Sequence, residues 1–155
     1  MVDIDARQAV QSDLPQLTRL LEELFAIEED FHYSHDLQMQ GLGLLLESES
    51  GTILVAAEST GTVVGMITGQ IVLSTAEGGR SLLVEDLIVD ERFRARGIGK
   101  LLLEKIEEWG HEFGARRMQL LADRKNHRAL EFYAHSGWQQ TKLICLRKYC
   151  EIGAK

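Results

Sequence analysis

The segment 81–113 constrains the fold more than any other part of the sequence, because a turn rich in arginine and glycine joins an apolar run to an amphipathic one. The run SLLVEDLIV (81–89) is apolar at both odd and even positions, which is typical of a strand buried on both faces. After the turn, apolar residues recur at the spacing of one helical face, and a glycine follows where helices commonly end; they are Ile98, Leu101, Leu102, Ile106, Trp109 and Phe113, followed by Gly114. The segment therefore predicts a strand, a tight turn and a long helix.

The rest of the chain alternates strand-forming and helical patterns. Further strands are expected at 5–10, 52–58, 63–74, 117–123 and 138–149. Helices are expected from Pro15 to Phe25, within 27–48 and over 126–137. Together these elements predict one α/β (α+β) domain over residues 1–155, with a mixed central sheet of about six to seven strands flanked by about four helices.

The turn itself concentrates positive charge, in Arg92, Arg94, Arg96 and Lys100. The whole chain has 17 Lys and Arg against 24 Asp and Glu, a net charge of −7. An acidic chain lacks the basic surface of nonspecific nucleic-acid binding, so we expect no nucleic-acid partner. Gly97 and Gly99 allow a ligand to approach the backbone closely, and the unpaired N–H groups that open a helix favour an anion. The turn therefore predicts a phosphate or pyrophosphate site.

Two familiar phosphate-binding motifs do not fit this turn. A Walker loop requires Ser or Thr after Gly-Lys, whereas Leu101 follows Lys100 and the earlier glycine of that motif is missing. A dinucleotide-binding fingerprint requires a third glycine where Leu102 stands. For the Arg-x-x-Gly-x-Gly pattern taken alone, a solvated basic turn is the alternative.

The sequence also bears on location and on metals. No apolar run approaches the roughly 20 residues of a membrane span. The N-terminal sequence lacks the basic start and apolar core of a secretory signal. Cys145 and Cys150 have no metal-ligand spacing and are expected to be reduced thiols. We expect a cytoplasmic protein with no membrane partner and no metal.

A longer pattern around the turn resembles the GNAT superfamily of N-acetyltransferases. It consists of the acidic pair Glu85-Asp86 in the strand, the turn RARGIG (94–99), Asn126 after the next strand, and the box FYAHSGW (132–138) with Tyr133. The resemblance is close over residues 81–140, and the preceding hairpin and helices match the family's order loosely. It implies a GNAT-like fold and an acetyl-CoA-dependent N-acetyltransferase.

The resemblance implies that the turn binds the pyrophosphate of acetyl-CoA, the cosubstrate. The residues carried over for this contact are Arg94, Ala95, Arg96, Gly97, Ile98, Gly99 and Lys100. In the strand, Leu87, Ile88 and Val89 are carried over as cofactor-binding residues, and the N–H near Leu87 or Ile88 is the group expected to polarise the thioester carbonyl. Asn126 is expected to contact the pantetheine arm of the cofactor, a role compatible with capping a helix.

Acetyl transfer to an amine requires proton transfers at both ends of the reaction. An aliphatic ammonium, with a pKa near about 10, must lose a proton before it attacks, and Glu85 is expected to be the general base. Asp86 or a water relay remains an alternative base, and strand alternation places the two carboxylates on opposite faces. Tyr133 matches the family's tyrosine that binds the cofactor and protonates the departing thiolate.

The acceptor is less constrained by the sequence than the cofactor. In this family the N-terminal helices, the hairpin and the last strands usually shape the acceptor site, and Glu28, Phe31, Tyr33 and Glu85 are the expected substrate-binding residues. An acidic, aromatic lining suits a cationic amine, and the small chain favours a small-molecule acceptor. A protein N-terminus or lysine is an alternative acceptor, and a nonenzymatic acyl-CoA-binding module is an alternative function. Homodimers are common among relatives, which leaves a homodimer open.

Overall fold

The strands of the computed structural model, which describes residues 3–151, form one sheet in the order β1-β2-β3-β4-β5. Each of the first four strands runs antiparallel to the next, and β5 is parallel to β4, so the predicted mixed sheet is confirmed. The strands are β1 (Ile4–Gln8), β2 (Gly51–Glu58), β3 (Val63–Ser74), β4 (Gly79–Val89) and β5 (Ala115–Gln119).

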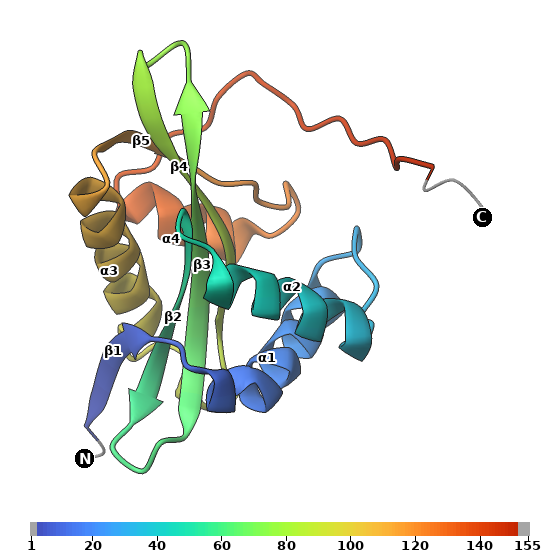
Figure 1. Cartoon of the computed structure of the whole chain (residues 1–155), viewed down its shortest axis with the longest axis vertical. Helices are drawn as coiled ribbons and strands as arrows, with labels where there is room; N and C mark the ends of the chain where they lie inside the picture. Colours follow the sequence, from blue (N-terminus) through green and yellow to red (C-terminus); the bar gives the residue numbers. More distant parts are fainter. Residues whose placement is uncertain (1–2, 152–155) are drawn as a thin grey trace. The chain divides into compact units, whose positions relative to one another are not determined.

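Two helices lie on one face of this sheet and a third lies on the other (Figure 1). They are α1 (Leu14–Ile27), preceded by a 3₁₀ turn at Gln11–Asp13, α2 (His35–Glu47), and α3 (Ile98–Glu112), preceded by a 3₁₀ turn at Glu91–Phe93. The leucines that recur at helical spacing in α1 are buried against alternate residues of β2, among them Ile53 and Val55. The packing of α1 on the sheet therefore follows from its apolar stripe.

Glycines allow α3 to approach the sheet closely. A Cβ added to Gly110 would lie 2.8 Å from Leu82 Cδ2, and one added to Gly69 would lie 2.9 Å from Ile106 Cδ1. Such distances leave no room for a side chain, so the α3 backbone at Gly110 packs directly on Leu82 of β4, and the β3 backbone at Gly69 packs directly on Ile106 of α3. This packing fixes the start of α3 relative to the end of β4, where the arginine-rich turn connects them.

The chain divides into two compact units, Met1–Leu120 and Leu121–Lys155. The first unit holds the sheet and the helices α1 to α3. The second holds α4 (His127–His135), whose start is capped by the Asn126 side chain, which accepts a hydrogen bond of 3.1 Å from the Ala129 N–H. Among residues 3–151, no helix is both long and apolar enough to span a membrane.

The predicted strand 138–149 is wrong: residues 138–151 form neither helix nor strand. The alternating apolar residues that predicted the strand are exposed instead, and they include Leu143, Ile144, Leu146 and Tyr149. A strand requires a hydrogen-bonded neighbour, and none of the described strands pairs with this segment. The sheet consequently has five strands in the described part of the chain, fewer than the six to seven expected.

Candidate active site

An irregularity in the pairing of β3 with β4 determines where the two acidic residues of β4 point. Thr68 pairs with Glu85 and Met66 pairs with Ile88, so β4 advances by three residues where β3 advances by two. The extra residue on β4 is a β-bulge, and Asp86 within it has a positive φ of 53°. A left-handed backbone at a residue other than glycine is costly and is typical of functional sites.

The bulge changes the expected arrangement of Glu85 and Asp86. Regular alternation predicts opposite faces for neighbouring residues, but both side chains line the same pocket. Asp86 is held there by Thr68, whose hydroxyl donates a hydrogen bond of 3.0 Å to Asp86 Oδ2. The predicted separation of the two carboxylates is therefore wrong, because the bulge interrupts the alternation.

The position of this acidic pair alters the protonation of both carboxyl groups. Burial raises the pKa of Glu85, and the neighbouring charge of Asp86 raises it further. Burial also raises the pKa of Asp86, against the opposing effect of the Thr68 hydrogen bond. The Glu85 side chain is nevertheless exposed, so it can exchange protons with solvent. A carboxylate with a raised pKa and access to solvent is suited to general base chemistry near neutral pH.

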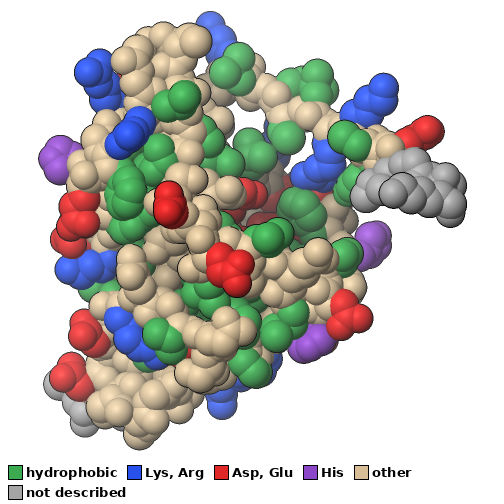
Figure 2. All heavy atoms as spheres, viewed as in Figure 1, with side chains coloured by type: hydrophobic (Ala, Val, Ile, Leu, Met, Phe, Trp, Pro, Cys, Tyr) green, Lys and Arg blue, Asp and Glu red, His purple; other side chains and the backbone are tan. Residues whose placement is uncertain are grey.

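The pocket has a volume of about 450 Å³ and lies between α1, α2 and the strands β3 and β4; we call it the α1–α2 pocket. Its apolar lining consists of Leu21, Phe25, Leu37, Leu42, Leu44 and Leu45, and the remaining lining consists of Gln38, Gly41, Ser48, Gln70, Glu85 and Asp86. Figure 2 shows hydrophobic and acidic side chains together on the face of the molecule that carries α2. The pocket is therefore apolar along its walls and negatively charged at the bulge.

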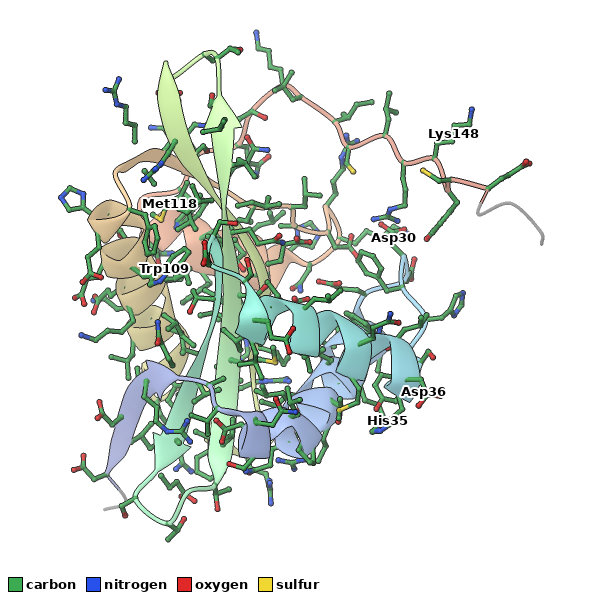
Figure 3. All side chains as sticks on the ribbon, in the orientation of Figure 1. Asp30, His35, Asp36, Trp109, Met118 and Lys148 are labelled. Atoms are coloured by element: carbon green, nitrogen blue, oxygen red, sulfur yellow. The ribbon has the colours of Figure 1, made fainter. Side chains whose placement is uncertain are left out.

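The predicted acceptor residues other than Glu85 lie on the connection between α1 and α2, outside the set that lines the pocket. Phe31 stacks at 5.4 Å between ring centroids on Phe25, which does line the pocket, and the Tyr33 hydroxyl lies 3.2 Å from His35 Nδ1. Figure 3 labels Asp30 on this connection, and His35 and Asp36 at the start of α2, which follows it. The roles of Glu28, Phe31 and Tyr33 in substrate binding stay predictions.

The pocket residues of α2 were missed from the sequence, although a signal for them exists. Leu37, Gly41, Leu44, Leu45 and Ser48 recur at intervals of three and four, the spacing of one helical face. Leu37 and Leu44 are exposed, which is unusual for leucines on the packed side of a helix. The sequence signal for this side of the pocket is a stripe of leucines on one face of α2 that a glycine interrupts.

The turn 94–100 presents unpaired backbone donors. Ala95 and Gly97 have positive φ angles of 61° and 80°, and the first hydrogen bond of α3 runs from the Leu101 N–H to the Gly97 carbonyl at 3.0 Å. Within the described residues, no backbone N–H of 94–100 donates to another protein atom. Consecutive free N–H groups in such a turn, at the positive end of a helix dipole, form an anion-binding concavity.

Two arginines of the turn make contacts within the protein. Arg94 Nε donates to the Val89 carbonyl at 2.9 Å, and Arg94 Nη2 lies 3.8 Å from Glu23 Oε2 on α1. Arg96 stacks over the Phe93 ring at 5.1 Å. These contacts help to hold the turn in place, and the backbone N–H groups of Arg94 and Arg96 remain unpaired within the described residues.

Asp90 anchors the start of the turn. Its carboxylate is buried and accepts hydrogen bonds from Arg92 Nε at 3.0 Å, from Arg92 Nη2 at 2.8 Å and from the Arg92 backbone N–H at 3.0 Å. These hydrogen bonds, together with the nearby charge of Arg19, lower the pKa of Asp90 to about 2. Asp90 is therefore ionised at all ordinary pH values and fixes the backbone where β4 leads into the turn.

The edge of β4 facing β5 is open beyond the middle of the strand. The pairing of β4 with β5 ends at Leu83 and Gln119, so in the described structure residues 84–89 have no partner on that side. The predicted cofactor-binding residues Leu87, Ile88 and Val89 lie on this stretch. An open strand edge offers backbone donors and acceptors to an extended ligand that contains amides.

In the second unit, Asn126 lies at the start of α4 and Tyr133 lies within this helix. The Tyr133 ring packs edge-on against Phe132 at 5.3 Å and against Trp138 at 5.9 Å between ring centroids. These aromatic contacts orient Tyr133 within its own unit. The predicted roles of Asn126 and Tyr133 toward the cofactor stay predictions.

Comparison with known proteins places the chain in a family. The sequence model of the acetyltransferase (GNAT) family matches residues 14–138. An uncharacterised N-acetyltransferase of Archaeoglobus fulgidus is 29% identical over 132 residues, which is 84% of this chain and 90% of that protein. N-alpha-acetyltransferase 80 of Mus musculus is 34% identical over 88 residues, which is 56% of this chain and 27% of the mouse protein.

Solved structures agree on the fold. The aminoglycoside N-acetyltransferase AAC(6')-Iy in complex with CoA has a TM-score of 0.83 and 21% identity, with 97% of each chain covered. The same enzyme in complex with a bisubstrate analogue, CoA-S-monomethyl-acetylneamine, has a TM-score of 0.81. At this identity the likeness concerns the fold, and the family match carries the classification. The chain belongs to the GNAT family of acetyltransferases, and the enzyme class predicted from its sequence, an acetyl-CoA-dependent acetyltransferase, is confirmed.

Proposed function

We propose that this protein transfers the acetyl group of acetyl-CoA to a primary amine of a small molecule by direct attack, with Glu85 as the general base and Tyr133 as the general acid. The observation that carries the proposal is the bulge of β4, which presents two carboxylates to one pocket next to an open strand edge and a turn of unpaired N–H groups. Together these features supply a place for the amine, the acyl group and the phosphates.

The residues present fit acetyl-CoA, which supplies a thioester as the acetyl donor. The N–H groups of the turn 94–100 would bind its pyrophosphate, and the absence of a protein acceptor for them within the described residues supports this role. The open edge of β4 over 84–89 would pair with the amides of the pantetheine arm. An N–H at Leu87 or Ile88, beside the bulge, would donate to the thioester carbonyl as negative charge develops on it.

The proposed base must take a proton from the acceptor ammonium. The pKa of Glu85 is raised, which makes its carboxylate a stronger base and brings its pKa closer to neutral pH, where a general base is most effective. The negative charge of Asp86 attracts the ammonium and increases the basicity of Glu85. The free amine then attacks the thioester carbon, the carbon–sulfur bond breaks, and Glu85 returns its proton to solvent.

The proposed acid completes the proton balance at sulfur. The leaving thiolate has a conjugate acid with a pKa of about 8.5 if it resembles cysteine, and a phenol with a pKa near about 10 can protonate it within hydrogen-bond distance. Tyr133 would donate this proton, and the second proton lost by the amine would return to the phenolate through solvent. The ring contacts of Tyr133 with Phe132 and Trp138 support a fixed orientation of the hydroxyl.

A small-molecule acceptor is supported by the size of the α1–α2 pocket, since about 450 Å³ is within the usual range for small-ligand sites. The fold relative AAC(6')-Iy has been solved with an acetylneamine bisubstrate analogue, which favours the same class. A protein N-terminus is the second candidate acceptor, favoured by the similarity to a mouse N-alpha-acetyltransferase. A cytoplasmic location, the absence of nucleic-acid, membrane and metal partners, and a homodimer stay predictions.

Two measurements test this proposal. Titration calorimetry with CoA is expected to show binding, and a thiol-release assay with acetyl-CoA is expected to show turnover with at least one primary amine. CoA binding without thiol release across small amines, lysine peptides and N-terminal peptides would instead identify a nonenzymatic acyl-CoA-binding module. The absence of CoA binding would overturn the assignment of the turn 94–100.

A further inference from the structure

The charge of the α1–α2 pocket is confined to one place. Glu85 and Asp86 are its only ionisable lining residues in the described structure, and both come from the bulge of β4. The acidic residues of the α1–α2 connection, Glu28, Glu29 and Asp30, do not line it, and neither does Asp36 in the first turn of α2. A ligand in this pocket can therefore place a positive charge against the two carboxylates, but its remaining atoms contact lining residues that carry no charge.

These uncharged lining residues are mostly apolar, with Gln38, Ser48 and Gln70 as their polar members. Six apolar side chains from α1 and α2 line the pocket, and two of them, Leu37 and Leu44, are 63% and 65% exposed. A ligand that covers this exposed leucine pair removes apolar surface from water, and this burial makes the free energy of binding more favourable. A second ammonium placed against these walls would lose hydration without gaining an ionic partner, which is unfavourable.

A glycine in α2 provides the space next to these leucines. Gly41 lines the pocket, and a Cβ added to it would meet no atom within 4 Å. Glycine weakens a helix interior, and close packing with another element does not account for it at this position. Open space beside Gly41 is what a bound molecule would use.

We propose that the acceptor is a primary amine with a single positive charge on an apolar body, and that Gly41 keeps the space in which this body binds. The ammonium lies at Glu85 and Asp86, and the body lies along α2 against the exposed leucines. Polyamines and aminoglycosides, which carry several charges, are disfavoured acceptors. This inference rests on the proposed function, since it specifies the acceptor of the same reaction.

A panel of amines tests the acceptor class. Phenylethylamine and hexylamine are expected to have kcat/KM values at least about 10-fold above those of spermidine and neamine, because one desolvated unpaired charge costs at least about 1.4 kcal/mol. A preference for spermidine or neamine would overturn the inference. A peptide with an apolar first residue that exceeds both small monoamines would also overturn it, in favour of a protein N-terminus.

Binding without turnover separates this inference from the proposed function. Calorimetry of phenylethylamine and spermidine with the protein, in the presence of CoA, reports the selectivity of the pocket even if no acetyl group is transferred. Tighter binding of phenylethylamine without thiol release would support the pocket chemistry while contradicting the catalytic proposal. Equal or weaker binding of phenylethylamine would contradict the pocket chemistry itself.

The variant Gly41→Leu tests the role of the glycine, and Gly43→Leu is its matched control. Gly43 lies in the same helix, has no atom within 4 Å of an added Cβ and does not line the pocket. Both variants are expected to raise Tm by about 2–4 °C, since leucine is the better helix former. Only Gly41→Leu is expected to raise the KM for phenylethylamine, by about 10-fold or more, with the KM for acetyl-CoA unchanged. An unchanged amine KM in Gly41→Leu, or an equal increase in both variants, would overturn the role of Gly41.

A second variant reverses the selectivity of the wall. Leu44→Glu adds a carboxylate at an exposed position of the pocket, and Leu73→Glu adds one at a leucine that is 85% exposed and lies outside it. Leu44→Glu is expected to raise the spermidine-to-phenylethylamine ratio of kcat/KM by about 10-fold, whereas Leu73→Glu leaves this ratio unchanged. Equal ratios in the two variants would show that the wall does not select the acceptor.

Discussion

The turn 94–100 and the α1–α2 pocket differ in the chemical groups that they present to a ligand. In the turn, the side chains of Arg94 and Arg96 contact the protein and the backbone N–H groups are unpaired. In the pocket, residues of α1, α2, β3 and β4 form the lining, and its only charged groups within the described residues are the two carboxylates of the β4 bulge. One site is therefore made of backbone and the other of side chains.

This difference predicts that the two sites tolerate substitution differently. A backbone site depends on dihedral angles, so it requires particular residues at a few positions such as Gly97. In a site made of side chains, the backbone keeps its shape when a lining residue is substituted, but the ligand that the site prefers changes. We therefore expect changes in the turn to affect the cofactor alone and changes in the pocket to affect turnover and acceptor choice.

The largest effect is expected from Glu85→Gln. Without the base, kcat should fall by about 100-fold, because general base catalysis contributes that factor or more. The raised pKa of Glu85 means that wild-type activity falls as pH decreases through this pKa, and the variant should lose this acidic limb. Steady-state kinetics from pH 5 to 9 measure both, and the Kd for CoA serves as the control that should not change. Near wild-type turnover would remove Glu85 from the mechanism.

A somewhat smaller effect is expected from Tyr133→Phe. Removal of the phenolic hydroxyl should lower kcat by about 30-fold while the KM for acetyl-CoA changes by less than about 3-fold, since the ring contacts are kept. Phe132→Leu is a control for the aromatic cluster, because it disturbs the packing and leaves the hydroxyl. If Tyr133→Phe retains full turnover, another group or water protonates the thiolate.

The backbone geometry of the turn 94–100 was largely predictable from sequence, and the lining of the α1–α2 pocket was not. Arginines and glycines in a fixed order identify the turn because backbone geometry imposes residue types on it, as at Gly97. The bulge at Asp86 depends on a mismatch between two strands, which the alternation of β4 alone does not reveal. The α2 residues that line the pocket are those on the face of the helix that no other element covers. Which face stays uncovered depends on how the helices pack on the sheet, so the sequence of α2 alone does not predict it.

The failed prediction of a strand at 138–149 has the same origin. Alternation of apolar residues measures the tendency to extend, whereas a strand exists only where a neighbour pairs with it. For 52–58 and 63–74 the neighbour is adjacent in sequence, and the hairpin was predicted correctly. For 138–149 any neighbour has to come from elsewhere, and local sequence carries no information about it.

A change of stability without a change of chemistry is expected from Asp90→Asn. The free energy of unfolding at pH 7 should fall by about 1.5 kcal/mol, since hydrogen bonds to charged partners contribute about that amount. The pKa of Asp90 is about 2 in the folded protein against an ordinary value of 3.8. Its contribution is therefore complete above about pH 4 and is lost as pH falls toward 2. Urea unfolding at pH 7 and at pH 2.5 measures this, and the difference between variant and wild type should shrink at the lower pH.

Gly97→Ala tests the backbone nature of the turn. Alanine at a φ of 80° costs about 1 kcal/mol, and the turn relaxes away from the geometry that aligns its N–H groups. The Kd for CoA should rise by about 5-fold while kcat at saturating acetyl-CoA stays the same. Gly61→Ala is the matched control, with a φ of 91° and no atom within 4 Å of the added Cβ, and should lose similar stability without weakening CoA binding. Equal CoA affinities in the two variants would contradict a backbone site.

The smallest and most discriminating effect is expected from Asp86→Asn. Asparagine keeps an oxygen that accepts the Thr68 hydrogen bond, so the bulge should persist, but it removes the charge that raises the pKa of Glu85. The acidic limb of the pH–kcat profile should therefore move to lower pH, with kcat at pH 8 reduced by less than about 3-fold. A limb that moves to higher pH would contradict the proposed coupling between the two carboxylates. A loss of turnover as large as that of Glu85→Gln would assign the base to Asp86. The acceptor ammonium would then bind at the buried carboxylate of Asp86 and not at the exposed carboxylate of Glu85.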